Sequence, residues 1–425
     1  MTSLKTICTF ILLLNTFVSV SQQKGANQDE RTFRIDPSDA IGANISQVFS
    51  SVNYIPLETT KGSVFGHIKQ LEVTEKYFII LDDDTNCILL FTKNGKFYQK
   101  IAGGNPSNQG NRIQYFTVNK WRNEIIYLSR NERTLKYFNF EGKNIKNVPI
   151  ASKEAVSLGQ ISKFINSDIA LTYNDYNSNY SGKRNLILFI DSLGNIKDQQ
   201  IPFNAENITN LDKVDNRYYR RVNLNFSKKF DGFLFTHSYD YNIYKVSLGH
   251  LDTLCRIIFP AKLGMADDFL SNDEYYNKAD DYFSSKNPSK INFLSNVYLI
   301  GNNLVFKWWN NKKDNLENLK NLIYNTKSGT LYAFNHILPD ASNYYLPIFD
   351  SERAYEDFIK ASSQDLNVGE TNVLYSSISS QLLFSTHKDR KDKKTIYSPE
   401  LISYFKVGKM TDNPVLVELK LRDAL

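Results

Sequence analysis

The sequence predicts an all-β protein, a six-bladed β-propeller of four-stranded antiparallel blades with short helical insertions between the blades. Three observations lead to this prediction: a length of 425 residues, an aromatic content of 13% that favours strands, and one strand–loop–strand pattern that recurs six times. A chain of this length exceeds one ordinary core, so it forms either several domains or one large domain built of repeats.

The recurring pattern is a strand that ends in a small or polar residue, a polar loop, and a second strand that leads into a glycine turn. Glycine is expected there because hairpin turns need a positive φ. The six pairs of strands and their glycines are Phe78–Asp82 and Cys87–Phe91 with Gly95, Glu124–Ser129 and Thr134–Phe138 with Gly142, Ile169–Thr172 and Asn185–Ile190 with Gly194, Phe233–Thr236 and Tyr241–Val246 with Gly249, Leu304–Lys307 and Lys320–Tyr324 with Gly329, and Leu382–Thr386 and Leu401–Val407 with Gly408.

Each pair is flanked by one further strand on either side. In the first unit these are Ile68–Val73 and Lys96–Ile101, and in the second unit Gln114–Val118 and Ile145–Ile150. Four strands at a period of about 40–50 residues are typical of a propeller blade. Two stacked β-sandwiches and a parallel β-helix are the alternatives. Sandwiches would not repeat one glycine pattern six times, and the coils of a β-helix are much shorter.

Two segments between the units predict short helices. Gly264–Asn287 carries aromatic residues at roughly helical spacing, and Asp350–Ala361 has a capping residue followed by apolar residues on one face. We expect their aromatic side chains to pack against the rim of the propeller.

The first 21 residues predict a secretory signal peptide. Lys5 precedes the apolar run Ile7–Leu14, and Ser19 and Ser21 place small residues at −3 and −1 of a cleavage point. We therefore expect an exported protein, periplasmic or extracellular, that has no transmembrane segment. Cys8 lies at the start of the apolar run and not just after it, which disfavours a lipid anchor.

Residues 22–49 are then expected to form an N-terminal extension with a candidate closing strand, and residues 50–425 the propeller. A propeller joins its last blade to its first, so the two ends of the chain should meet. Both Arg31–Asp36 and Val52–Leu57 are candidates for the strand that closes the ring. We also expect Arg31–Asp36 to dock on the propeller as an extra strand.

Several of these segments resemble the six-bladed β-propeller proteins exported by Bacteroides-type bacteria, which are loosely similar to NHL-repeat propellers. Tyr54–Thr59 resembles the first motif of that family, Ile88–Phe91 with Asn94–Phe97 its first blade, and Asn413–Val417 its closing strand. The chain departs from the family at Gly103–Gly110, which lacks the glutamate of a Gly-Pro-Gly-Glu segment. It also lacks the signal of the lipoprotein members. The resemblance implies the fold and export, and no catalytic residue.

The sequence lacks the motifs of common catalytic and cofactor sites. No Lys-Ser or Lys-Thr follows Gly103–Gly110, and Asp82–Asp84 lacks the glycine and the distant glutamate of an EF-hand loop. Three cysteines exclude a disulfide framework, and five scattered histidines disfavour a metal cluster. Cys87 and Cys255 fall in opposite blades, so we expect no disulfide between them. No cofactor, metal or catalytic residue is predicted.

The lengths of the connections predict which face binds a ligand. When the strands of a blade are lettered a to d from the axis outwards, the a–b and c–d turns share one face, and the b–c turns and d–a crossovers share the other. All long connections belong to the second class, so we call this the long-loop face and its opposite the tight-turn face. Long loops often carry function. The candidate binding residues on the long-loop face are Tyr176, Arg184, Tyr239, Tyr241, Trp309 and Tyr345.

Strand alternation bears on the candidate Trp309 and on its neighbour Trp308. Trp308 and Trp309 are adjacent on a predicted strand and point to opposite faces, so at most one is expected in the core. The other is either packed between blades or exposed as a platform for a sugar or a peptide.

The absence of histidine clusters and nucleophile motifs favours a binding or interaction module, a monomer that recognises a glycan, a peptide or an envelope protein through the long-loop face. The net charge of +6 falls to +5 without the signal peptide and is dispersed, and secretion argues against nucleic acid. A hydrolase or lyase with its site at the mouth of the axial channel is the alternative, and a structural part of an envelope complex is a third. The fold alone does not choose among them.

Overall fold

The structure is a computed structural model of the chain. It describes the following residues: 31–66, 68–105, 107, 109–150, 162–173, 184–192, 194–203, 222–227, 229–266, 268–269, 272, 282–312, 319–350, 367–368, 373–390, 395–422 and 425.

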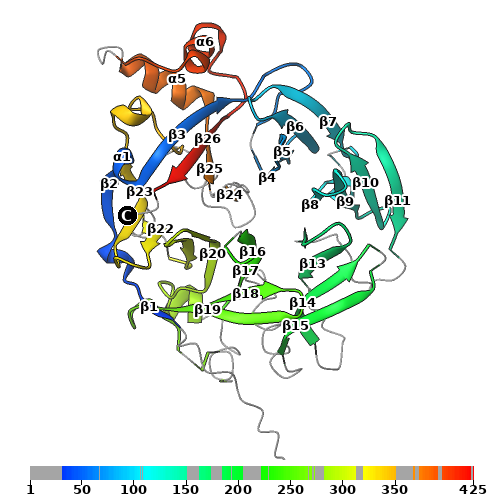
Figure 1. Ribbon diagram of the computed structural model, residues 1–425, viewed down its shortest axis with the longest axis vertical. Helices are drawn as coiled ribbons and strands as arrows, with labels where there is room; N and C mark the ends of the chain where they lie inside the picture. Colours follow the sequence, from blue (N-terminus) through cyan, green and yellow to red (C-terminus); the bar gives the residue numbers. More distant parts are fainter. Residues whose placement is uncertain are drawn as a thin grey trace, which may run out of the picture.

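Six β-sheets form a ring, and the strands of each blade follow one another from the axis to the outside, as Figure 1 shows. The prediction of a six-bladed propeller is confirmed. Blade one is β4 (Gln70–Val73), β5 (Tyr77–Asp82), β6 (Cys87–Thr92) and β7 (Phe97–Ala102); blade two is β8 (Phe116–Asn119), β9 (Glu124–Ser129), β10 (Thr134–Asn139) and β11 (Asn144–Pro149); blade three is β12 (Ser162–Phe164), β13 (Ile169–Tyr173), β14 (Arg184–Asp191) and β15 (Ile196–Phe203).

Blades four and five each carry a fifth strand on the outside, and blade six is completed by the N-terminal part of the chain. Blade four is β16 (Val222–Ser227), β17 (Gly232–His237), β18 (Asn242–Ser247), β19 (His250–Ile258) and β1 (Thr32–Arg34); blade five is β20 (Phe293–Ile300), β21 (Asn303–Trp309), β22 (Asn321–Asn325), β23 (Leu331–Leu338) and β2 (Ile41–Asn44); blade six is β24 (Asn367–Val368), β25 (Val373–Ile378), β26 (Val415–Leu421) and β3 (Phe49–Pro56).

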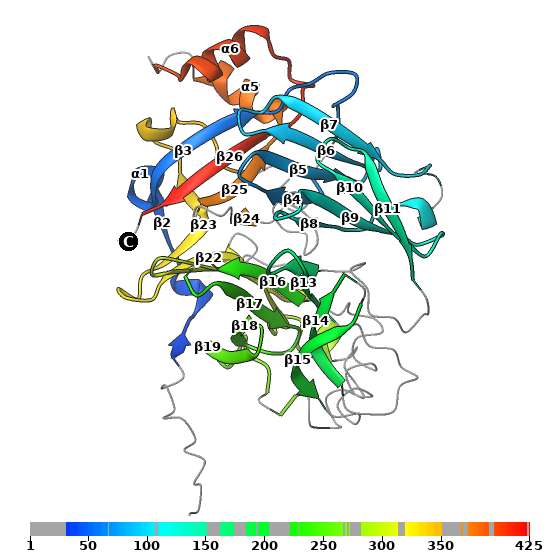
Figure 2. The same ribbon diagram turned by 45° about the vertical axis from the view of Figure 1, so that its right-hand side comes forward.

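The N-terminal strands follow the outside of three consecutive blades. β1 pairs in parallel with β19, and β2 pairs in parallel with β23. β3 then pairs antiparallel with β26, from Pro56 opposite Val415 to Phe49 opposite Leu421 (Figure 2). Of the two candidate closing strands, the second therefore closes the ring, and the first docks as the expected extra strand on blade four.

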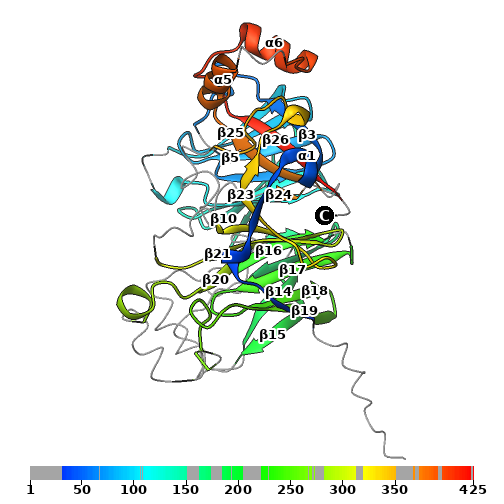
Figure 3. The same ribbon diagram turned by 90° about the vertical axis from the view of Figure 1, so that its left-hand side faces the viewer.

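The assignment of the sixth predicted unit was wrong. Leu382–Thr386 and Leu401–Val407 are helical, within α5 (Ser380–Asp389) and α6 (Pro399–Val407). The hydroxyls of Ser379 and Ser398 cap these helices, and Pro399 stands in the first turn of α6, where a proline is tolerated. Both helices lie in the b–c connection of blade six, and Figure 3 shows them at the edge of the ring.

The glycine pattern separates the five correct units from the sixth. Five glycines lie in c–d turns and have a positive φ, which is +80° at Gly95. They are Gly95, Gly142, Gly194, Gly249 and Gly329. Gly408 instead follows α6 with a φ of −75°. The glycine of a hairpin turn and the glycine after a helix have the same sequence signal, because both end an ordered element.

Hydrophobic side chains fill each gap between neighbouring blades, in six clusters. In β5, Phe78 and Ile80 pack toward blade six, while Ile79 and Leu81 pack toward blade two. Both faces of a blade are therefore buried, which explains why these strands are apolar at every position.

The remaining helical elements of the described residues are short. They are α1 (Ile45–Val48), 3₁₀ turns at Pro37–Asp39, Gln109–Asn111 and Ala341–Asn343, and a π-helical turn at Tyr282–Lys286. That π-helical turn lies within the predicted helical segment Gly264–Asn287, which the structure describes only in part. The predicted helix over Asp350–Ala361 lies outside the described residues except for Asp350. Cys87 and Cys255 are both buried and unbonded, as predicted.

Candidate functional site

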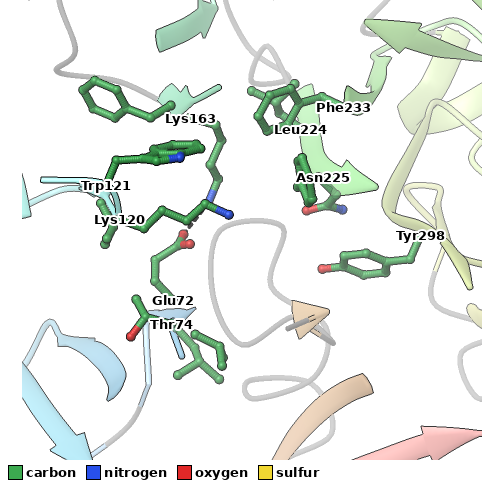
Figure 4. A pocket seen from close by; sticks show the side chains of 14 residues that line it. Glu72, Thr74, Lys120, Trp121, Lys163, Leu224, Asn225, Phe233 and Tyr298 are labelled. Carbon is green, nitrogen blue, oxygen red and sulfur yellow. Dashed lines mark hydrogen bonds and ion pairs between the residues drawn. The ribbon is translucent and has the colours of Figure 1, made fainter. Parts of the chain in front are cut away.

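A pocket opens at the axis of the ring, where the inner strands of blades one to five end (Figure 4). It has a volume of about 120 Å³. Several of its residues stand at or just beyond the end of the innermost strand (strand a) of a blade. The a–b turns begin there, so the pocket belongs to the tight-turn face. The lining residues are Leu71, Glu72, Val73, Thr74, Val118, Lys120, Trp121, Lys163, Phe164, Leu224, Asn225, Phe226, Phe233 and Tyr298.

An ion pair spans the pocket wall from blade one to blade three. Glu72 on β4 accepts a hydrogen bond from the ammonium group of Lys163 on β12. The same carboxylate oxygen accepts a second bond from the Gln70 side chain, at 3.1 Å. Both charged side chains are partly exposed, at 23% and 30%. The pair links two inner strands that are not neighbours in the ring.

Two aromatic side chains from blades two and four face solvent at the mouth. Trp121, in the turn after β8, is 46% exposed, and Phe226, near the end of β16, is 38% exposed. The Lys120 ammonium group lies 4.8 Å from the centre of the Trp121 ring and 5.4 Å from that of Phe226. A cation is attracted to the face of an aromatic ring. The three side chains therefore form a surface at the mouth that is both apolar and positively charged.

The turn that presents Lys120 and Trp121 is held from both sides. The Asn119 amide group donates to the Ser167 carbonyl of blade three at 2.9 Å, and its oxygen accepts from the backbone N–H of Arg122. The Arg122 guanidinium pairs with Asp168, again on blade three. The indole is therefore mounted on a turn that is fixed to the next blade, which lowers the entropy lost on binding.

None of the binding residues predicted from the sequence lines this pocket. A signal was present: the first strand of several units carries polar residues at alternate positions, such as Gln70 and Glu72, or Asn223 and Asn225. Alternation in the innermost strand indicates side chains that point into the channel. The convergence of five such strands on one point is a property of the ring and not of any single strand.

On the long-loop face, the structure places the predicted site residues at the rim, where most of those it describes are engaged within the protein. Tyr176 lies outside the described residues, and Arg184 begins β14. Tyr239 is only 6% exposed, and its ring centre lies 5.4 Å from that of Phe269.

The other predicted site residues lie along blades four to six. The Tyr241 hydroxyl donates to the Ile291 carbonyl at 2.7 Å and accepts from the backbone N–H of Met265. The Trp309 indole donates to the Ser295 hydroxyl at 2.6 Å. Tyr345 has a φ of +56° in the crossover to blade six. The contacts of Tyr241 join the b–c turn of blade four to the crossover that follows, whereas the bond of Trp309 lies between two strands of blade five. They do not bring the side chains together around a pocket among the described residues.

A charged cluster orders the b–c turn of blade four between these tyrosines. The Asp240 carboxylate accepts hydrogen bonds from the Tyr244 hydroxyl at 2.6 Å and from the backbone N–H of Asn242 at 2.9 Å, and it pairs with His237 at 3.2 Å. Burial acts to raise the pKa of Asp240, but the histidine and these donors outweigh it, so the pKa lies below its ordinary value of 3.8.

Replacing Asp240 by asparagine is expected to lower the free energy of unfolding at pH 7 by about 2 kcal/mol, because hydrogen bonds to a charged group are lost. Since the folded pKa is depressed, this stabilisation is present above the ordinary pKa and is lost as the pH falls through the folded value. Urea unfolding of both proteins between pH 7 and pH 3 should show the difference shrinking below about pH 4. Asp252, whose side chain is 38% exposed against 17% for Asp240, provides the control, Asp252→Asn, for which a smaller effect is expected; a pH-independent difference would contradict the prediction.

The chain was then compared with known proteins. The family described as a domain of unknown function, DUF4934, matches residues 32–420. The chain belongs to this family. The match reaches into all six blades and includes the N-terminal strands β1 to β3, so the strands that close the ring lie within the matched part of the chain.

A solved structure agrees with the fold of this DUF4934 protein. It is a crystal structure from Bacteroides fragilis, described as that of an exported protein, and it is 14% identical with a TM-score of 0.57; the match covers 92% of this chain and 99% of that chain. At this identity the likeness supports the fold alone. The chain also matches a member of the duf4221 family from Bacteroides vulgatus, which is 12% identical with a TM-score of 0.42, over 67% of this chain and 84% of that chain. No curated protein matches the chain.

In the part of the chain that the structure describes, no helix is both long enough and apolar enough to cross a membrane.

Proposed function

We propose that this DUF4934 protein is an exported binding protein whose ligand enters the channel mouth on the tight-turn face. The observation that carries the proposal is the pair of exposed rings, Trp121 and Phe226, beside a cavity at the axis of the ring. A concave site with apolar walls and a few polar groups is the usual form of a ligand site. The fixed turn of Trp121 supports binding because little ordering is required.

The export that we propose rests on the sequence of residues 1–21, with its apolar run and small residues at the cleavage point. The ligand would then be met in the periplasm or outside the cell. Mass spectrometry of the N-terminus of the protein recovered from those fractions tests this, since an intact Met1 would contradict it.

The experiment that tests the site uses glycan and peptide arrays probed with the chain lacking residues 1–21. We expect one class of ligand to bind, and binding to fall at least about tenfold in the double variant Trp121→Ala/Phe226→Ala, because stacking on two rings is lost. Both side chains are substantially exposed, so the variant should fold. An unchanged mass of the bound ligand after incubation separates binding from hydrolysis or elimination at the same mouth.

The long-loop face is the second proposed site, with Tyr176, Arg184, Tyr239, Tyr241, Trp309 and Tyr345 as its candidate residues. The length of the b–c and d–a connections supports it, because long loops often bind ligands. The matched variant is Tyr241→Phe/Trp309→Phe, which keeps an aromatic ring at each position, removes the hydroxyl, and replaces the indole and its N–H by a phenyl ring. Loss of array binding in this variant, with normal binding in the Trp121 variant, would move the site to the long-loop face.

A further inference from the structure

The lining of the channel-mouth pocket combines apolar and polar side chains in similar shares. Besides Phe226, six lining side chains are aliphatic or aromatic and carry no polar atom: Leu71, Val73, Val118, Phe164, Leu224 and Phe233. A hydroxyl group placed against these side chains would give up its hydrogen bonds to water without replacement. We therefore expect the part of the ligand that lies against them to be apolar.

The size of the cavity limits this apolar part to a single group. Its volume is about 120 Å³. A dry apolar cavity of about 150 Å³ holds one benzene molecule. One aromatic ring or one branched aliphatic side chain fits, while a larger apolar body does not.

Two neutral polar side chains of the lining, Asn225 and Thr74, already have partners within the protein. The Asn225 amide nitrogen donates to Asn223 Oδ1 and to the Val297 carbonyl, both at 3.0 Å. The Thr74 hydroxyl donates to the Tyr77 carbonyl and accepts from its N–H. These groups are poorly suited to recognise the many hydroxyls of a sugar.

The charged groups of the rim favour an anion. Two lysines, Lys120 and Lys163, and one glutamate, Glu72, line the pocket, so the lining carries a net positive charge. The ammonium groups of both lysines extend to the same side of the cavity, beside the Glu72 carboxylate, in Figure 4. An anionic group that lies next to the apolar group would meet this positive field at close range.

We propose that the channel mouth binds an apolar group with a carboxylate next to it, as presented by the C-terminal aromatic or aliphatic residue of a peptide. The side chain fills the cavity, the carboxylate lies against Lys120 and Lys163, and Trp121 and Phe226 flank the preceding peptide unit. This inference rests on the proposed function, because it assigns a ligand class to the same site. A small apolar acid presents the same chemistry without the preceding peptide unit.

The probes are an N-acetylated hexapeptide of glycine and serine that ends in phenylalanine, its C-terminal amide, the same peptide ending in glycine, and N-acetylphenylalanine. Titration calorimetry measures affinity. Tryptophan fluorescence reports on the mouth, because Trp121 is one of only three tryptophans in the chain. We expect the acid to bind at least about tenfold more tightly than the amide or the glycine peptide, and less tightly as salt is raised. Binding of the hexapeptide but not of N-acetylphenylalanine would show that the ligand is a peptide C-terminus and not a small apolar acid.

The charge variant is Lys120→Gln, which leaves the pair of Lys163 and Glu72 in place. It should weaken binding of the acid about tenfold and leave the amide unaffected. The matched control is Lys76→Gln, an exposed lysine of the β4–β5 turn that does not line the pocket, which should change neither.

Three results overturn the inference. Equal affinity for the acid and the amide would show that the site does not recognise a carboxylate. No binding of the acid peptide at about 1 mM would show that it does not recognise a peptide C-terminus. The third result is that an oligosaccharide binds where the peptides do not, and that its binding is lost in Trp121→Ala. That result would overturn the proposed ligand class but would keep the channel mouth as the binding site. If a bound ligand is insensitive to Trp121→Ala/Phe226→Ala, the proposed function fails together with the inference.

Discussion

Replacing Asn413 by alanine is expected to lower the free energy of unfolding by about 3–5 kcal/mol, because three hydrogen bonds are lost and two buried partners, the Phe65 N–H and the Ser63 carbonyl, are left unpaired. The Asn413 side chain is 1% exposed. Its oxygen accepts from the Phe65 N–H at 3.0 Å, and its nitrogen donates to the carbonyls of Glu58 and Ser63 at 3.0 and 2.9 Å. These bonds join the last segment before β26 to the crossover that leads from β3 into blade one.

Equilibrium urea unfolding measures the effect, through the midpoint and the slope. The matched control is Asn53→Ala on β3, an exposed asparagine whose amide donates to Glu418 at 2.9 Å. It should change stability by about 0.5 kcal/mol or less, since exposed polar contacts contribute little. Equal losses in the two variants would show that Asn413 does not hold the ring closed.

A second large loss of stability is expected for Trp308→Ala, again about 3–5 kcal/mol. The Trp308 ring is fully buried between blades four and five, within the cluster that includes Leu234 and Leu294. Its indole N–H also donates to the Leu319 carbonyl at 2.9 Å. The variant therefore leaves both a large cavity and an unpaired carbonyl.

The neighbouring tryptophan provides the comparison. Trp309 points to the other side of the same strand, packs partly buried against the cluster between blades five and six, and donates to Ser295. Trp309→Ala should lower the unfolding free energy by less than half as much, because part of the ring already contacts water. Thermal unfolding monitored by circular dichroism checks the order, and a larger loss at Trp309 would contradict it.

The two tryptophans show how far strand alternation reaches. The sequence places them on opposite faces, because successive side chains of a strand alternate. It does not say which face is deeper. That is decided by the neighbouring blades: the gap between blades four and five encloses Trp308, while the other gap leaves Trp309 partly open.

Blade six shows why periodicity failed there. Two short apolar segments, Leu382–Thr386 and Leu401–Val407, form helices there. The second is followed by Gly408, as the second strand of each of the five true hairpins is followed by a glycine. The capping serines and Pro399 were local signals of a helix, and the repeat pattern concealed them. Meanwhile β24 is two residues long and β3 precedes blade one in the sequence, so no local pattern unites blade six.

By itself the sequence determined the all-β class, the number of blades, the two central strands of each of blades one to five and the positive φ of their turn glycines, because each depends on residues close together in the chain. Only the tertiary structure decided the closing strand, the partners of Asn413 and the channel mouth. Glu72, Trp121, Lys163 and Phe226 come from four different blades, and their proximity follows from the curvature of the closed ring. Each strand encodes its own pairing, but a site on the axis is made by all the blades together.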